Sequence, residues 1–390
     1  MERPPWILPV IVFAQFAGAS LWFAGNAVLP DLQDALGVDG LLGLVTSAVQ
    51  VGFIVGTLIS AFSGLADRIS ARTLFLISAF LGALFNLGVL IAPTPEAVAA
   101  ARFLTGVCLA GIYPIGMKIA AGWYQRGLGG AMGWLVGALV LGTAFPHFIR
   151  GLGAALPWRI VLLSTSGLAV LGGMLLYAFV PDGPHLSPAR RFSAGALREV
   201  FAVPAFRAAA LGYWGHMWEL YTVWAFIPAM LAAHTSDLSV SAWSAAIIGA
   251  GAVGCVGGGW LTHRLSSRNV AAIQLLISGT CCLLFPLMLQ TPTPIFAGYL
   301  LIWGITVVGD SPQFSALNAR ACPPELLGSG LTIVTSIGFA LTVVSIEVTE
   351  AIGALDIAVP ALAVGPVWGL IAMMGSGPGS SRPNTPTHEA

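Results

Sequence analysis

Long uncharged apolar runs recur from one end of this chain to the other, and they restrict its fold more than any other feature. A helix of roughly 20 apolar residues crosses the hydrocarbon core of a bilayer. Backbone polar groups inside lipid must pair within the protein, so such runs become helices. The runs predict an all-α integral membrane protein with twelve transmembrane helices, six in each half. The predicted spans are residues 7–29, 41–62, 73–92, 97–119, 128–149, 160–180, 208–231, 241–261, 270–290, 296–318, 328–350 and 357–374.

The composition indicates lipid rather than water as the surrounding medium. Apolar residues make up 57% of the 390 residues and charged residues only 8%, against roughly 25% charged in soluble domains. The formal net charge is zero, and no basic surface predicts a nucleic-acid partner. The five cysteines lack the spacing of a disulfide framework or a zinc site, so we expect no metal and no other cofactor.

A ten-residue segment occurs twice, half a chain apart. Ser63-Gly-Leu-Ala-Asp-Arg-Ile-Ser-Ala-Arg72 corresponds to Gly259-Trp-Leu-Thr-His-Arg-Leu-Ser-Ser-Arg268, and each copy is a basic loop between two apolar runs. Internal repeats of this kind are typical of secondary transporters. We therefore expect two pseudo-symmetric six-helix bundles, residues 1–180 and 208–374, joined by a cytoplasmic linker over 181–207 and followed by a disordered tail over 375–390.

The loop cations set the predicted orientation. If the N-terminus is cytoplasmic, nearly all loop Lys and Arg residues fall inside, and only Arg150 and Arg159 fall outside. The sequence thus predicts a multi-pass protein of the bacterial inner (cell) membrane, a monomer in contact with the lipid bilayer, with both termini in the cytoplasm.

Two prolines extend the repeat into the spans. Gly111-Ile-Tyr-Pro114 and Gly309-Asp-Ser-Pro312 lie at matching depth in the fourth and tenth spans. Because proline removes an intrahelical hydrogen bond, both helices should be kinked or locally unwound there.

The first basic loop resembles the signature of the major facilitator superfamily, Gly-x-Leu-Ala-Asp-Arg-x-Gly-Arg-Lys. Asp67 and Arg68 match its acidic and basic positions and Arg72 its last cation, whereas Ser63, Ser70 and Ala71 depart from it. The segment Arg102-Phe-Leu-Thr-Gly106 is similar to the family's Arg-x-x-x-Gly element. The resemblance implies two rocking bundles around a central site, with the second, fifth, eighth and eleventh helices carrying the contacts between halves.

The repeated loops are candidates for a conformational latch. A carboxylate at a helix end can face the N-terminus of another helix, and arginines can pair with carboxylates or carbonyls. The alternative is that the arginines only set the topology. The predicted latch residues are Asp67, Arg68, Arg72, Arg264 and Arg268.

Ionisable side chains inside the spans are the best candidates for substrate binding and proton coupling, because burying one in lipid is costly. His216 and Glu219 share a face of the seventh span, which the family places against the central cavity, and they could exchange a proton. Glu219 is the leading candidate for proton coupling or substrate binding, unless it is a packing carboxylate with an interhelical partner. Arg102, Asp310 and Glu347 are further candidates; Asp310 could instead cap a broken helix.

An aromatic stripe in the seventh span includes Trp218 and Tyr221. It could stack on an organic substrate or simply pack against lipid and helices. Small residues at four-residue spacing in the second, fifth and eighth spans predict close helix contacts, which we assign to the moving interface.

These features predict a secondary active transporter that moves a small polar or charged solute by alternating access, as a proton symporter. The alternatives are an exporter of amphipathic organic compounds and a non-transporting membrane sensor. The Gly-Pro-x-x-Gly-Gly element of drug antiporters is missing from the fifth span. An enzyme is not expected, because no nucleophile with a base and no metal cluster stands in the spans, and no catalytic residue is assigned.

Overall fold

A computed structural model describes residues 4–124, 128–153, 156–185, 196–234, 238–323 and 326–375. The predicted disordered tail beyond Gly375, the middle of the predicted linker and the side chain of Asp67 lie outside these described parts. Within them, the chain is helical from end to end, as the apolar runs predict.

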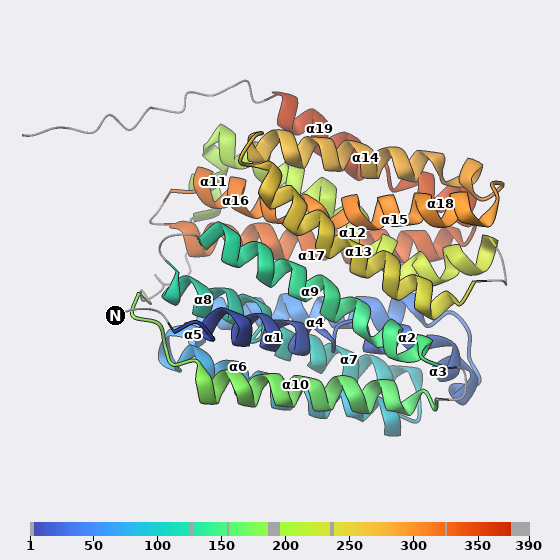
Figure 1. Cartoon of the computed structure of the whole chain (residues 1–390), viewed down its shortest axis with the longest axis horizontal. Helices are drawn as coiled ribbons and strands as arrows, with labels where there is room; N and C mark the ends of the chain where they lie inside the picture. Colours follow the sequence, from blue (N-terminus) through green and yellow to red (C-terminus); the bar gives the residue numbers. More distant parts are fainter. Residues whose placement is uncertain are drawn as a thin grey trace, which may run out of the picture.

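The N-terminal half contributes six membrane-spanning segments (Figure 1). They are α1 (Ile7–Ala19) with α2 (Ala24–Ala27), α4 (Leu42–Ser63), α6 (Ala71–Gly88), α7 (Pro95–Leu109) with α8 (Tyr113–Trp123), α9 (Leu128–Gly151) and α10 (Arg159–Phe179). Three short helices connect them, namely α3 (Leu29–Leu36), α5 (Leu65–Arg68) and η1 (Val89–Ile91).

The C-terminal half repeats this order after the short helix α11 (Ala196–Ala202). Its segments are α12 (Pro204–His234), α13 (Val240–Leu261), α14 (Ser267–Met288), α15 (Thr293–Gly309) with α16 (Ser311–Ala321), α17 (Leu327–Ile352) and α18 (Leu355–Ala361) with α19 (Val364–Gly375). In the described chain, ten segments are long and apolar enough to cross a membrane. The first segment and the more polar α12 complete the twelve.

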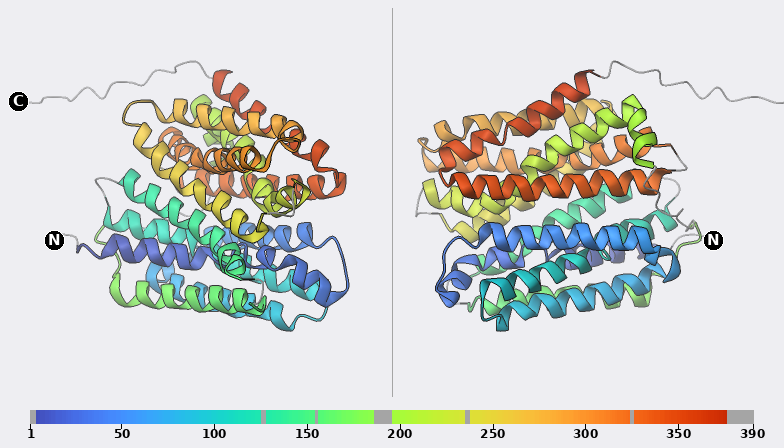
Figure 2. Two further views of the ribbon diagram at one scale, coloured as in Figure 1. Left: turned by 45° about the vertical axis from the view of Figure 1, so that its right-hand side comes forward. Right: turned by 180° about the vertical axis from the view of Figure 1, so that it is seen from behind.

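The two halves form two groups of roughly aligned helices. Figure 1 shows the blue-to-green half below and the yellow-to-red half above, and Figure 2 shows the same separation from two other directions. Across the boundary α9 packs on α13 and α4 on α17.

The α9–α13 contact is tight at one end and opens toward the other. At the C-terminal end of α9, a Cβ on Gly151 would lie 2.9 Å from the backbone nitrogen of Ala242. Farther along, the Cβ position of Gly137 is 3.8 Å from Val256, and the positions of Gly130 and Gly133 have no described atom within 4 Å. The halves are therefore closed at the face that carries the end of α9, which the predicted orientation makes the outer face.

The predicted breaks at the two prolines are confirmed. The fourth span is interrupted between Leu109 and Tyr113, and the tenth at Asp310, with proline in the first turn of each following helix. Two further breaks were not predicted, at residues 20–23 of the first span and at 362–363 of the last. Neither break has a proline at the interrupted residues themselves, so the sequence gave no local signal at those positions.

The glycine stripes mainly serve packing within each half, and their assignment to the moving interface is largely wrong. Gly52 and Gly56 lie against the α7 backbone at Phe103 and Val107, both in the N-terminal half. Gly254 lies against Ile305 of α15 in the C-terminal half. Gly137 is the residue of these stripes that faces the other half.

Gly254→Ala should destabilise the protein, because the added Cβ would lie 1.8 Å from the backbone oxygen of Ile305. Overpacking of this kind costs about 1–3 kcal/mol. Gly257→Ala on the same helix is the matched control, since its Cβ position has no described atom within 4 Å. Thermal unfolding in detergent should show a lower Tm for Gly254→Ala alone; equal Tm values would contradict the close helix contact.

Candidate functional site

A small cavity of about 30 Å³ lies between the two halves at mid-length of the helices. The N-terminal half contributes Tyr113 of α8 and Val136 and Leu139 of α9. The C-terminal half contributes Tyr213, Met217, Leu220, Tyr221, Trp224, Val308, Ser311 and Phe339. The wall is thus aromatic and apolar, with a few hydroxyl groups, and it has room for about two water molecules in this closed form.

An aromatic cluster beside the cavity joins the halves. The Trp22 ring stacks on Tyr221 at 5.7 Å and on Phe339 at 5.6 Å between ring centroids, and Phe53 lies 4.5 Å from Phe339. Trp22 stands in the unpredicted break of the first span and is almost fully buried. Stacked pairs of this kind contribute about 0.5–1.5 kcal/mol beyond burial, so the cluster helps to hold this conformation together.

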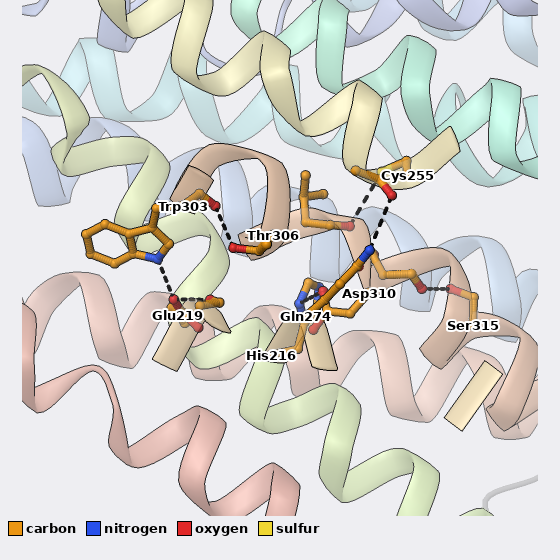
Figure 3. A network of polar contacts seen from close by, with 12 residues as sticks. His216, Glu219, Cys255, Gln274, Trp303, Thr306, Asp310 and Ser315 are labelled. Atoms are coloured by element: carbon orange, nitrogen blue, oxygen red, sulfur yellow. Dashed lines mark hydrogen bonds and ion pairs between the residues drawn. The ribbon is translucent and has the colours of Figure 1, made fainter. Parts of the chain in front are cut away.

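Glu219 lies inside the C-terminal half, where neutral donors surround one of its oxygens. Its Oε1 accepts hydrogen bonds from Trp303 Nε1 at 2.7 Å, from Cys282 Sγ at 3.3 Å and from Ser278 Oγ. Figure 3 shows the indole of Trp303 directed at this carboxylate. The side chain is 1% exposed. The interhelical donors tie α12 to α14 and α15.

His216 pairs with Asp310 and not with Glu219. His216 Nδ1 lies 2.8 Å from Asp310 Oδ1, and both side chains are 1% exposed. Asp310 occupies the break between α15 and α16, beside the polar side chain of Gln274 (Figure 3). The expected proton exchange between His216 and Glu219 therefore has no direct contact in the described structure.

The seventh span presents different faces to the cavity and to its own bundle. Its cavity residues follow helical spacing along one side, and Tyr221 and Trp224 belong to them. His216 and Glu219 lie away from the centre of that side, and neither lines the cavity in this conformation. The expectation that Glu219 faces the central cavity is thus wrong for this form. Its assignment to proton coupling stays a prediction.

Arg102 is fully buried and anchors the break in the first span. Its guanidinium donates to the backbone oxygens of Leu21, at 3.0 Å, and Trp22, and to Asn86 Oδ1 at 3.1 Å. Asn86 in turn donates to Ser166 of α10 at 3.0 Å. This predicted substrate residue lies outside the cavity wall and instead positions the chain that carries Trp22.

The two predicted aromatic residues have different places. Tyr221 lines the cavity and stacks on Trp22. Trp218 packs at the contact of α12 with α19, where a Cβ on Gly365 would lie 2.8 Å from its side chain. Trp218 therefore belongs to packing within the C-terminal half.

Two carboxylates join the halves at the closed face. Glu350 Oε2 accepts a hydrogen bond from the backbone nitrogen of Gly43, at 2.7 Å, in the first turn of α4. Glu347 Oε1 accepts one from Ser47 Oγ at 2.6 Å. We call these two contacts the α4–α17 lock. Glu347 was predicted near the substrate and lies in this lock instead, and Glu350 was not predicted as a site residue.

The predicted latch arginines contact neighbours within their own halves. Arg72 lies over the ring of Tyr177 at 5.2 Å, and Arg264 over Trp260 at 5.3 Å. Arg268 donates to the backbone oxygen of Met373. Arg68 ends the short helix α5 and is exposed. The latch stays a prediction, because the side chain of Asp67 is not described.

Sequence reasoning missed the cavity residues Tyr113 and Phe339 and gave Trp22 no role. Tyr113 could have been found, because it precedes Pro114 in the repeated break. Over the described ranges, no three His, Cys, Asp or Glu side chains gather as a metal site.

Comparison with known proteins places this architecture in a family. The model of the Major Facilitator Superfamily matches residues 11–346. The chain belongs to this family, whose members are transporters and not enzymes, and it is a multi-pass membrane protein.

The relatives transport small organic or inorganic anions by name. The chain is 24% identical to a 4-hydroxybenzoate transporter of Pseudomonas aeruginosa, over 80% of this chain and 78% of that one. It is 25% identical to a gallate transporter of Pseudomonas putida, over 85% and 82%. It is 26% identical to a probable nitrate/nitrite transporter of Mycobacterium tuberculosis, over 84% and 85%.

Solved structures share the fold. A human organic anion transporter matches with a TM-score of 0.71 and 14% identity, covering 95% of this chain and 100% of that one. The nucleoside transporter NupG matches with a TM-score of 0.72 and 15% identity, covering 95% and 99%.

Proposed function

We propose that this protein carries small aromatic carboxylic acids across the bacterial inner membrane by alternating access, coupled to protons. The observation that carries the proposal is the aromatic wall of the cavity between the halves. Relatives named as transporters of 4-hydroxybenzoate and gallate support the substrate class.

The cavity wall suits a flat ring with polar substituents. Tyr221, Trp224 and Phe339 supply aromatic faces on which a planar ring can stack. The indole N–H of Trp224 is buried and has no hydrogen-bond partner in the described structure, so it is available to an acceptor on the solute. Thermal shift of the purified protein with a series of benzoates tests this, because a ligand of the folded state raises apparent stability. Stabilisation by nitrate but not by any benzoate would contradict the aromatic class.

Glu219 is the coupling residue of this proposal. A buried carboxylate whose partners are neutral donors has no cation to balance its charge, and taking up a proton removes that charge. Its contacts with α14 and α15 would change when the C-terminal bundle rearranges, which links the proton to the conformation.

The α4–α17 lock holds the halves closed on the outer face in this proposal. Glu350 accepts from the N-terminus of α4, where helix dipole and unpaired N–H groups favour a carboxylate. Breaking both contacts would let α17 move away from α4, so the lock favours the form that opens to the cytoplasm.

Removal of both lock carboxylates should shift the protein toward the outward-open form. Hydrogen bonds to charged acceptors contribute about 1.5–3 kcal/mol each when buried. Since Glu347 is exposed, we expect a smaller sum and a shift of about tenfold in Glu347→Ala/Glu350→Ala. Spin labels at Gly40 and Ala354 should report a longer distance, whereas Asp356→Ala, which removes an exposed carboxylate nearby, should leave the distribution unchanged. An unchanged distribution in the double variant would remove the lock.

The proposed orientation rests on the loop cations and is checked by labelling. A cysteine introduced at Arg264 should be shielded from an impermeant thiol reagent added outside intact cells, and one at Asp237 should react. The reverse pattern would invert the topology and with it the assignment of the lock to the outer face.

A second candidate is the export of amphipathic organic compounds. The observation that favours it is the apolar wall, in which Val136, Leu139 and Leu220 lie beside the rings. Transport of uncharged aromatic compounds in preference to benzoates, in proteoliposomes, would favour this candidate.

A further inference from the structure

The two broken helices are equivalent by the internal repeat. The second helix of each, α8 and α16, is 11 residues long, and each has its proline in the first turn. Their first residues, Tyr113 and Ser311, both line the cavity between the halves. Each half therefore directs a helix N-terminus toward the centre of the protein.

In the C-terminal half a carboxylate of the chain already stands at this N-terminus. Asp310 is the N-cap residue of α16 and pairs with His216. The ring of His216 lies 5.8 Å from Phe314 in the first turn. Anionic groups are stabilised at helix N-termini by the helix dipole and by the unpaired N–H groups.

In the N-terminal half the equivalent position is apolar. Ile112 is the N-cap residue of α8, and it is buried against Gly18 of α1. Where the C-terminal half has Phe314, this half has Gly116. Among the described residues around this turn, no carboxylate plays the part that Asp310 plays for α16.

An unpartnered amide lies against this turn. A Cβ on Gly116 would lie 2.2 Å from Gln15 Oε1, so the Gln15 side chain fills the space that a larger residue would take. Gln15 is 0% exposed, and both its Oε1 and its Nε2 lack a hydrogen-bond partner in the described structure. Such a group costs free energy unless a ligand or water pairs with it.

We infer that the first turn of α8, together with the amide of Gln15, binds the carboxylate of the transported solute. The inference rests on the proposed function and adds the position and polarity of the bound solute. Tyr113 lines the cavity, and Gly116 lies one turn deeper on the same side of α8. The carboxylate thus enters the N-terminal half, while the ring stays against Tyr221 and Trp224. The site binds an anion with backbone N–H groups and an amide, and Arg102 is committed to the carbonyls of the first span.

The test compares an acid with its amide. Binding of 4-hydroxybenzoate and of 4-hydroxybenzamide to the purified protein is measured by calorimetry for wild type, Gln15→Leu and Gln50→Leu. Gln50 is the matched control, because it is equally buried in the same half and its amide also lacks a described partner. We expect Gln15→Leu to weaken binding of the acid about tenfold or more and to leave the amide within about twofold. Gln50→Leu should keep the wild-type preference.

The possible failures are distinct. Unchanged acid binding in Gln15→Leu, or an equal loss for acid and amide, would overturn the carboxylate site while the proposed function stands. An equal loss of acid binding in Gln50→Leu would assign the effect to packing and also overturn it. If wild-type protein binds neither compound, the proposed function fails and this site fails with it.

Discussion

Glu219→Gln should abolish accumulation of the solute driven by a proton gradient while solute binding and exchange remain. Glutamine keeps an Oε1 acceptor for Trp303 and Ser278 at nearly the same volume, so the contacts of α12 with α14 and α15 can persist. It cannot take up and release a proton. The measurement is uptake against counterflow in proteoliposomes of the same preparation.

Ser278→Ala is the control for this variant. It removes one donor to Glu219 but keeps the carboxyl group, so accumulation should continue. If Glu219→Gln still concentrates its solute under an imposed pH difference, Glu219 is not the coupling residue. Asp310, the other fully buried carboxylate that we assigned, then becomes the next candidate.

Arg102→Met should strongly destabilise the protein. The substitution leaves the carbonyls of Leu21 and Trp22 and the side chain of Asn86 without their donor in a fully buried place. An unpaired buried polar group costs about 1–3 kcal/mol, so the three together predict a loss of at least about 3 kcal/mol. The Tm in detergent should fall sharply.

Arg264→Met separates this effect from the loss of a cation in general. Arg264 lies over an exposed tryptophan, a contact that contributes about 0.5–1 kcal/mol. Its Tm should stay close to that of wild type. A normally folded Arg102→Met that has lost only solute binding would restore Arg102 to the substrate site and contradict its role as an anchor.

The sequence predicted the architecture well, because the constraint of lipid acts on composition. Runs of apolar residues become spans with bounds within a few residues of α4, α9 or α17. The prolines 114 and 312 mark the two symmetric breaks, since proline removes a hydrogen bond wherever it stands. The break of the first span had no such mark, because a side chain from α7, that of Arg102, holds it open.

The site was harder to predict, because helical spacing says which residues share a face but not what packs on that face. His216 and Glu219 are three residues apart, yet one meets Asp310 and the other Ser278 and Trp303. Glu350 stands near a helix end, where it could as well be solvated, and only the position of α4 gives it a partner. Spacing of small residues likewise shows close packing without naming the neighbour.

The central claim is tested most directly by uptake of labelled 4-hydroxybenzoate into proteoliposomes under an imposed pH gradient, with protein-free liposomes as the measure of passive entry. The account predicts accumulation above the protein-free level that a protonophore collapses. Uptake that ignores the gradient would contradict proton coupling. Binding without any protein-dependent uptake would contradict transport of this acid and favour a sensor.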